Sequence, residues 1–422
     1  MLNQVCYRNI NKTDSWTLRA YENTGGYMVW RNIIKHRTPA ADIIAEIKTS
    51  SLRGRGGAGF PTGLKWSFIP SDLPGQRYVI CNADESEPGT FKDRDILRFN
   101  PHQLIEGIVI ACYVMRASVA YIFLRGEFWE PFQRCEQALK DANAAGLIGK
   151  NIFGTGINIE IYTHMSAGAY ICGEETALMN ALEGQKGFPR FKPPFPANFG
   201  LYGKPTNINN VETYTSVPVI LEKGGQWFAN LGRPRNGGSK IFSVSGHVVK
   251  PGNYELPLGT PFSKLLATAG GVRRGAKLKA VIPGGSSMPV LPGDIMMRTN
   301  MDFDSLIQSG SMLGSGGVIV MDESTCMVKV LARISKFYMQ ESCGQCTPCR
   351  EGTGWIYRLV KNIEDGIGTL ESIERLRCVA KKIPSRTICA FGEAATWPVE
   401  GFLKHFYDEF KYHVTHKKCL VS

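Results

Sequence analysis

The chain has 422 residues, of which 43% are apolar and 20% are charged, so it can bury a large core and is expected to divide into two or three domains. This composition excludes disordered proteins, collagen-like proteins and disulfide-stapled miniproteins. The formal charge of +12 suits nucleic acid, acidic lipid, an acidic partner protein or a polyanionic cofactor, and by itself it selects none of them.

No segment of the sequence has the pattern of a membrane span or an export signal. The longest uninterrupted apolar stretch, residues 107–115, is well short of the roughly 20 residues that cross a bilayer. Residues 1–5 lack the basic-then-apolar profile of a secretion signal and the Arg- and Ser-rich profile of a transit peptide. We therefore expect the mature protein to start here, in a reducing cytosol, with its 12 cysteines serving metal ligation rather than disulfides.

The first quarter of the chain predicts a helix, a glycine-rich loop and a strand. Apolar residues at helical spacing over 40–50 lead directly into the loop over 53–63. Residues 78–81 read as a short buried strand, which ends in a polar, turn-rich loop over 82–89. We expect that loop to form the rim of a site.

The pattern then alternates between helix and strand. A mostly buried helix is predicted over 104–115, a core strand over 119–124 and a surface helix over 132–145. This alternation indicates a largely parallel sheet. Five prolines between residues 188 and 205 predict a stiff, extended loop.

The last part of the chain changes pattern twice. Short β signals separated by Pro/Gly turns predict a small β-rich domain over about 239–321, and four helical patterns follow it. We predict three domains, with boundaries at 1–238, 239–325 and 326–422. The sequence contains no internal repeat.

The cysteine run is the strongest chemical signal. Cys343, Cys346 and Cys349 stand at two-residue spacing, and Cys389 follows at a distance. One tight loop can cover three corners of a 4Fe-4S cube while a residue from elsewhere completes the fourth. Zinc usually takes two separated Cys pairs or Cys/His mixtures and is the weaker alternative. Spacing does not choose the fourth ligand, for which the other candidates are Cys326, Cys378 and Cys419.

The glycine loop formally contains the dinucleotide fingerprint G-x-G-x-x-G at Gly54, Gly56 and Gly59. That fingerprint requires a preceding strand, and here a helix precedes it, so the usual strand–turn–helix interpretation fails. The glycines still let backbone N–H groups approach a ring or a phosphate, and three basic residues nearby add charge. These are Arg53, Arg55 and Lys65. A flexible surface turn and an RGG-type nucleic-acid tract are the alternatives, although such tracts repeat and this one does not.

Acidic, amide and aromatic residues cluster near these loops. Asp84, Glu85 and Glu87, and the pair Glu174–Glu175, either form a solvated surface or accept hydrogen bonds in a cofactor cleft. The pair could also open a helix at its N-terminus. A second polar set, read as a turn or as a cofactor clamp, comprises Asn207, Asn209, Asn210 and Thr213. Three aromatic residues beside Gly or Pro loops are either core or stacking surfaces: Phe60, Phe68 and Phe195. The histidines show no metal-ligand spacing, so a hydrolytic zinc site or Ser-His-Asp site has no support.

Six motifs in order resemble one family. They are residues 53–66, 81–90, 172–176, 193–196 and 209–213, and the cysteine run. Together they resemble the NADH-binding FMN/4Fe-4S flavoprotein subunits of respiratory complex I, the F subunits of NADH-quinone oxidoreductase, over about residues 17–397. The resemblance implies an α/β fold in which an FMN-binding α/β domain is followed by a small ubiquitin-like β-grasp domain and a C-terminal helical bundle carrying an iron–sulfur cluster. Residues 1–16 match weakly, and Glu393 stands where the family often has Asp.

The resemblance also implies roles for individual residues. FMN would be held by Gly54, Gly56, Lys65, Asn82, Asp84, Tyr170, Gly173, Glu174, Asn209, Asn210 and Thr213, and the same cofactor-binding set includes Arg55, Gly57, Gly59 and Glu85. Phe60, Phe68 and Phe195 would stack on the adenine side. Glu87, Glu175 and Lys192 would lie near the nucleotide, with Glu87 and Glu175 as the expected catalytic pair. The cluster ligands would be Cys343, Cys346, Cys349 and Cys389.

In this family NADH gives a hydride to FMN, and electrons pass singly to a 4Fe-4S cluster and on towards quinone. The resemblance implies two partners within complex I, the subunit that carries a 2Fe-2S cluster and the large iron–sulfur subunit, and a peripheral place on the cytoplasmic face of a bacterial inner membrane. No nucleic acid is expected as a partner. The alternatives are a diaphorase subunit of an NAD-linked hydrogenase or formate dehydrogenase and, from another class, a non-enzymic basic binding protein.

Overall fold

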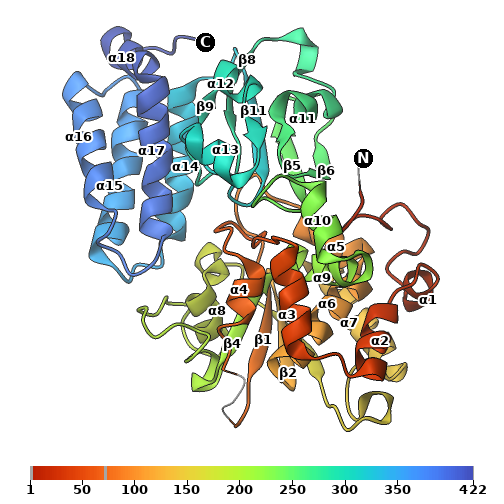
Figure 1. Ribbon diagram of the computed structural model, residues 1–422. Coiled ribbons are helices and arrows are strands. Elements are labelled where there is room, and N and C mark those ends of the chain that lie inside the picture. The colour runs from red at the N-terminus through yellow and green to blue at the C-terminus, as the bar shows by residue number, and fades with distance from the viewer. Residues whose placement is uncertain (1–2, 71–73, 422) are drawn as a thin grey trace.

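The computed structural model describes residues 3–70 and 74–421 (Figure 1). Its first sheet has four strands in the order β3-β2-β1-β4, and every neighbouring pair is parallel. The strands are β1 (Tyr78–Ala83), β2 (Val119–Leu124), β3 (Glu160–Met165) and β4 (Thr206–Asn210). The parallel sheet expected from the alternating pattern is thereby confirmed. The sequence pattern predicted β1 and β2 and missed β3 and β4.

Helices surround this sheet. They are α1 (Leu18–Glu22), α2 (Met28–His36), α3 (Ala40–Thr49), α4 (Thr62–Trp66), α5 (Asp93–Phe99), α6 (Pro101–Met115), α7 (Trp129–Ala144), α8 (Glu175–Leu182), α9 (Val211–Lys223) and α10 (Gly225–Leu231). Nearly all of α6 is buried, as the sequence predicts, because it packs against α9 in the core beneath the sheet. The proline-rich segment between α8 and β4 contains no α-helix or strand, which confirms the expected loop.

Alternate residues of β1 point to different cores. Val79 and Cys81 pack with α6 and α9, whereas Ile80 faces the opposite side of the sheet. On that side the core is continuous with the C-terminal helices, since Ile80 belongs to the same buried cluster as Leu331 and Phe402. One continuous buried core therefore joins the first sheet to the C-terminal helices.

The middle part of the chain forms a second, mixed sheet in the order β6-β5-β11-β8-β9. Its strands are β5 (Ser239–Gly246), β6 (Gly252–Pro257), β8 (Leu278–Ile282), β9 (Leu291–Pro292) and β11 (Gly317–Asp322), with a two-stranded ribbon of β7 (Thr260–Pro261) and β10 (Asn300–Met301). Its helices are α11 (Phe262–Thr268), α12 (Gly293–Met297) and α13 (Phe303–Gln308). The central pair β5 and β11 is parallel and the outer pairs are antiparallel.

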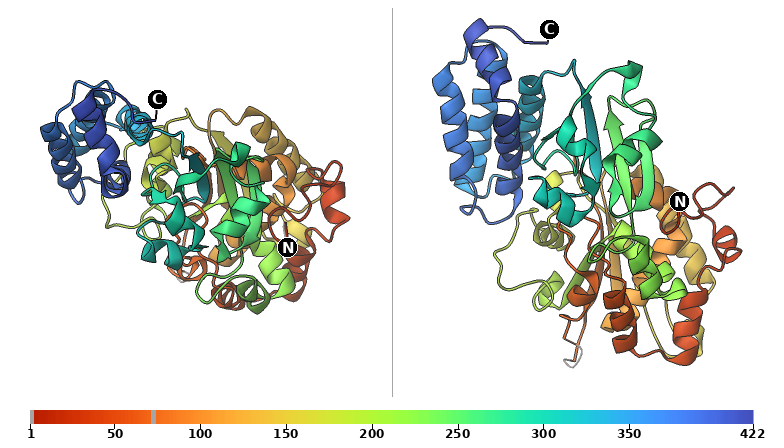
Figure 2. Two further views of the ribbon diagram at one scale, coloured as in Figure 1. Left: turned by 90° about the horizontal axis from the view of Figure 1, so that it is seen from above. Right: turned by 45° about the horizontal axis from the view of Figure 1, so that its top comes forward.

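Five helices complete the chain and stand beside the second sheet (Figures 1 and 2). They are α14 (Met327–Glu341), α15 (Thr347–Glu364), α16 (Leu370–Lys382), α17 (Phe391–His405) and α18 (Tyr407–His416). The predicted succession of a parallel α/β part, a small β-rich part and a helical bundle is thus confirmed. Across the described residues, no helix combines the length and apolarity needed to span a bilayer.

Candidate functional site

A cavity of about 430 Å³ lies where the three parts of the chain meet, a size typical of small-molecule sites. The carboxyl ends of β1 and β4 open towards it, which is the usual ligand position in a parallel sheet. The second sheet contributes Gly284, Ser287, Met288 and residues 313–315, and the helical bundle contributes Ala390, Phe391, Ala394 and Trp397. None of these lining residues was predicted from the sequence as a site residue.

About half of the sequence-predicted site residues line this cavity. They are Arg55, Gly56, Gly57, Asn82, Asp84, Glu85, Glu87, Tyr170, Gly173, Glu174 and Asn210. The others do not line it: Gly54, Gly59, Phe60, Lys65, Phe68, Glu175, Lys192, Phe195, Asn209 and Thr213.

The glycine loop presents backbone to the cavity. The Gly54 amide donates to the Phe60 carbonyl at 2.8 Å, which closes the loop on itself. A Cβ on Gly56 would lie 3.1 Å from Asn210 Cβ, and Gly57 has a φ of +142°, which side chains rarely adopt. The loop is therefore closed by its own hydrogen bond and forms part of the cavity wall.

The guanidinium groups of Arg53 and Arg55 already bind other groups of the protein. Arg55 is fully buried and donates to the carbonyls of Arg53, Gly237 and Ser239, so its guanidinium holds the loop against the start of β5. Arg53 pairs with Asp304, and its guanidinium lies 4.1 Å from the centre of the Phe303 ring. Both arginines line the cavity, but their guanidinium groups are bonded within the protein.

Three neighbouring acids have three different environments. Glu85 accepts the amides of Lys92, Asp93 and Arg94 and so caps the start of α5. Glu87 accepts the Tyr170 hydroxyl at 2.6 Å and the Ser287 amide at 2.7 Å, and burial raises its pKa. Burial also raises the pKa of Asp84, to about 6. The interpretation of this cluster as a solvated surface is wrong, because Asp84 and Glu85 are buried.

One of the two carboxylate oxygens of Asp84 has no hydrogen-bond partner. Its Oδ1 accepts the Ser86 hydroxyl at 2.7 Å, while its Oδ2 is buried without a hydrogen-bond partner. A buried acceptor left unpaired costs about 1–3 kcal/mol, more when charged. Because Asp84 lines the cavity, a ligand that donates a hydrogen bond there would remove this cost.

A cluster of paired charges lies at the edge of the cavity, which Glu174 lines and Glu175, Lys65 and Lys192 do not. Glu174 caps α8 by accepting the amides of Thr176 and Ala177, which confirms that the Glu pair opens a helix. Lys192 binds Glu175 at 2.6 Å and Glu174 at 3.1 Å. Burial alone would raise the pKa of Glu175, but Lys65 and Lys192 outweigh it and lower this pKa.

The three singled-out phenylalanines are not core. Phe60, Phe68 and Phe195 are 45%, 49% and 55% exposed, and the rings of Phe60 and Phe68 lie 6.0 Å apart. They are free to stack on a planar ligand outside the cavity.

The Asn-rich segment is a strand-to-helix junction, so the interpretation as a turn is wrong. Asn210 ends β4, caps α9 by accepting the Glu212 amide, and donates to Asp93 at 2.6 Å. Asn209 accepts the Trp66 indole N–H at 3.0 Å. Thr213 Oγ1 accepts the Arg55 amide at 2.9 Å, which ties this junction to the glycine loop.

Four thiols gather around a second, small cavity. Cys343, Cys346, Cys349 and Cys389 line it. The Ile388 amide donates to Cys346 Sγ at 3.3 Å, a contact that stabilises a sulfur carrying negative charge. These sulfurs are not among the groups of ligand atoms that converge within 4.8 Å in the described part of the chain, as expected for the corners of a cube rather than for one ion. Cys378 is exposed, and Cys326 and Cys419 lie together elsewhere.

The two cavities share a wall. Ile171 and Phe391 line both of them, so a single layer of side chains separates the larger cavity from the cysteine site. Phe391 follows Cys389 by two residues, which is the one sequence signal that could have identified it.

Comparison with known proteins agrees with this geometry. Residues 47–219 match a family model described as the Nuo51 FMN-binding domain, residues 241–291 match the SLBB domain, and residues 329–413 match the NADH-ubiquinone oxidoreductase-F iron-sulfur binding region. The F subunit of NADH-quinone oxidoreductase from Rickettsia bellii is 56% identical over 371 residues, which are 87% of this chain and 89% of the relative. That of Rickettsia rickettsii is 53% identical over 408 residues, 96% of each chain. The chain belongs to the family of NADH-quinone oxidoreductase F subunits.

A solved structure is also similar to this member of the F-subunit family. The crystal structure of an NAD+-reducing [NiFe]-hydrogenase in its H2-reduced state superposes with a TM-score of 0.82 at 35% identity. The match covers 90% of this chain and 64% of the hydrogenase chain, so this chain spans less than two thirds of that neighbour.

The residues present fit the two cofactors of the family. For FMN, the cavity offers a glycine backbone that leaves room for close approach and the carboxyl of Asp84, which lines the cavity and has one oxygen without a hydrogen-bond partner. For a 4Fe-4S cluster, the small cavity offers four cysteine sulfurs. The alternative of a non-enzymic basic binding protein is wrong, since the chain carries FMN-binding and iron–sulfur-binding regions of an oxidoreductase family.

Proposed function

We propose that this chain is the electron-input subunit of respiratory complex I, oxidising NADH and passing electrons singly towards quinone. When bound, FMN supplies two-electron chemistry with NADH and one-electron chemistry with a 4Fe-4S cluster. The observation that carries the proposal is the shared wall. Because Ile171 and Phe391 line both cavities, a cofactor in each would be separated only by these side chains.

The protein's contribution is orientation and the exclusion of water. The Gly56–Gly57 backbone and Asp84 would hold FMN, with Asn82, Gly173, Glu174 and Asn210 around them. Glu87 would orient the nicotinamide side through the hydroxyl of Tyr170 and the Ser286–Ser287 turn that it binds. No side chain is required as a general acid, since the bound cofactors would themselves supply the hydride chemistry.

Outside the cavity, three exposed aromatic rings and the two lysines paired with Glu175 would contact the part of NADH beyond the nicotinamide. Phe60, Phe68 and Phe195 offer stacking surfaces for adenine. Lys65 and Lys192 bind Glu175 in the free protein, and we assign to these groups contacts with the nucleotide.

For partners, we propose the 2Fe-2S-carrying subunit and the large iron–sulfur subunit of complex I, on the cytoplasmic face of the inner membrane. The formal charge of +12 supports contact with an acidic partner surface.

The test is the visible spectrum of anaerobically purified protein before and after NADH, with low-temperature EPR on the reduced sample. We expect flavin bands that bleach on adding NADH and a 4Fe-4S signal that is absent in Cys346→Ser. The matched control is Cys378→Ser, an exposed thiol on α16. Folded protein without flavin or iron would overturn the proposal.

The similarity to the NAD+-reducing hydrogenase favours one alternative, a diaphorase subunit of such an enzyme. Cells lacking this chain distinguish the two. Loss of NADH-dependent quinone reduction in membranes supports the complex I assignment, whereas loss of H2- or formate-dependent NAD+ reduction in the membrane-free fraction supports the diaphorase.

A further inference from the structure

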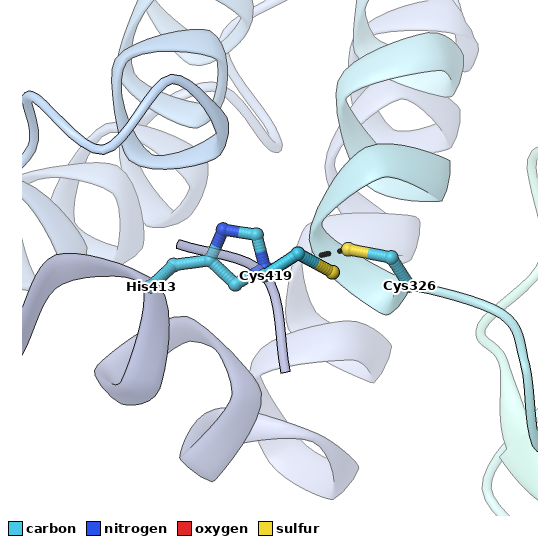
Figure 3. Close-up of side chains that lie close together, drawn as sticks. All are labelled: Cys326, His413 and Cys419. Atoms are coloured by element: carbon cyan, nitrogen blue, oxygen red, sulfur yellow. Dashed lines mark hydrogen bonds between the residues drawn. The ribbon is translucent and has the colours of Figure 1, made fainter. Parts of the chain in front are cut away.

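A third group of metal-ligating side chains lies away from both cavities. The ligand atoms of Cys326, His413 and Cys419 all lie within 4.8 Å of one another, in a part of the bundle that carries no proposed cluster ligand (Figure 3). Cys326 Sγ is 3.4 Å from His413 Nε2. None of these residues is used by the proposed function.

Hydrogen bonds between secondary-structure elements hold these residues close together. Cys326 is the N-cap of α14, and its sulfur accepts the Lys329 amide at 3.4 Å. The same end of α14 is bound to α18 by Glu409, which accepts the Met327 amide at 3.1 Å and pairs with Lys279 at 2.7 Å. His413 therefore faces Cys326 from a helix that is itself held in place.

The tail that carries Cys419 is also fixed. Lys417 ends α18, and its amide donates to the His413 carbonyl at 2.9 Å. Its ammonium donates to the Gly368 carbonyl at 2.8 Å, in the loop before α16. Cys419, two residues later, is thereby directed back towards the start of α14, where its thiol interacts with that of Cys326.

His413 is oriented as a ligand. The residue is only 2% exposed, and its Nε2 faces the sulfur of Cys326. Its other ring nitrogen, Nδ1, is buried without a hydrogen-bond partner.

We propose that Cys326, His413 and Cys419 bind a thiophilic divalent cation, Zn²⁺ in the first place, at a site separate from the iron–sulfur cluster. Two thiolates and one imidazole are ligands that suit zinc, and water would complete a tetrahedron. With typical Zn–S and Zn–N bonds, neighbouring S and N ligands stand about 3.6 Å apart, close to the 3.4 Å between Cys326 Sγ and His413 Nε2. The ion would fasten α18 and the tail to the start of α14.

The experiment measures zinc and iron together by mass spectrometry of the elements, on full-length protein purified anaerobically with its cluster and equilibrated with a small excess of Zn²⁺. We expect about one zinc per chain beyond the iron. Cys419→Ser, which alters only the tail, should lower zinc at least tenfold and leave iron unchanged. Cys378→Ser, the exposed thiol on α16, should change neither.

Cobalt supplies an independent readout. Co²⁺ at this site should give sulfur-to-cobalt charge-transfer bands that Cys326→Ser and Cys419→Ser both weaken. Iron-loaded, folded wild type that binds no zinc would overturn the proposal, as would equal zinc in Cys419→Ser. A Cys326–Cys419 disulfide found by peptide mapping would also overturn it, since it consumes both thiols. Because iron and flavin are measured in the same samples, failure here is distinct from failure of the proposed function.

Discussion

At the scale of single residues, the loop over 82–89 shows that carboxyl groups close together in the sequence take different roles because their surroundings differ. Glu85 caps α5 by accepting backbone amides. Glu87 accepts both the Tyr170 hydroxyl and the Ser287 amide, so it links Tyr170 to the loop between β8 and β9. Of these three acids, Asp84 alone lines the cavity with a carboxylate oxygen that has no hydrogen-bond partner. A sequence in which these acids stand within four positions cannot separate their roles, because the donors that distinguish them come from other elements.

Asp84 should make flavin binding depend on pH. Burial raises the pKa of this carboxyl to about 6 in the free protein, and a donor on Oδ2 favours the ionised form. Binding therefore releases a proton, so affinity should fall as the pH drops below about 6, by up to about tenfold per pH unit. Fluorescence quenching of riboflavin is the measurement, since the phosphate of FMN titrates near the same pH.

Asp84→Asn should bind riboflavin about tenfold or more weakly at pH 7 and lose this pH dependence. Glu371→Gln, which removes an exposed acid on α16, should retain both the affinity and the profile. A wild-type affinity that is constant between pH 5 and 7 would contradict the assignment of Asp84 as the acceptor.

At the scale of elements, the sequence predicted those whose pattern is local. The buried strand β1, the helix α6 and the cysteine loop follow from apolar spacing and ligand spacing alone. The strand β4 (TNINN) was missed because asparagine is depleted in strands, and it is held in the sheet by its pairing with β1. The edge strand β3 mixes polar and apolar residues on both faces. The lining residues of the second sheet carry no local signal, since only tertiary packing brings them to the cavity.

The junction between α9 and β5 holds a buried charge network. Glu212 accepts the ammonium of Lys240 at 2.6 Å and lies 2.9 Å from that of Lys92, and all three side chains are at most 2% exposed. Its other oxygen accepts the Ile241 amide at 2.8 Å. Because α9 belongs to the first sheet's layer and β5 to the second sheet, these bonds join two parts of the molecule.

Glu212→Gln should destabilise this junction by about 3–5 kcal/mol at pH 7, because it leaves buried ammonium groups without their partner. Burial would raise the pKa of Glu212, but Lys240, Lys92 and Arg55 outweigh it and lower this pKa to about 2. The stabilisation is therefore present above about pH 4.5 and is lost as the pH falls towards 2. In calorimetry the difference in unfolding temperature from wild type should shrink over that range. Glu222→Gln, on the same helix and half-exposed beside Arg8, should change stability by less than about 1 kcal/mol.

At the scale of the whole molecule, an aromatic cluster fixes the three parts around the two cavities. The ring of Phe391 lies 5.7 Å from that of Tyr170 and 5.6 Å from that of Tyr338. Tyr170 binds Glu87 in the first part, and Tyr338 binds Ser286 in the loop between β8 and β9 of the second part. Each of the three parts thus reaches the shared wall, which explains how the distance between two cofactors could be set by side chains that neither ligate iron nor contact substrate.

Phe391→Ala should open this wall. Phe391 is 6% exposed, and removing a buried phenylalanine costs about 3–5 kcal/mol and leaves a cavity. That cavity would join the two existing ones and admit water and oxygen to the cysteine site, so iron release to a chelator in air should become several-fold faster than in wild type. The matched control is Phe402→Ala, since Phe402 is fully buried on the same helix and lines neither cavity. It should lose similar stability without the faster iron release, because Phe391, unlike Phe402, belongs to the wall that it forms with Ile171 between the cysteines and the larger cavity. Equal rates of iron release in the two variants would show that stability alone, and not the wall, protects the cluster.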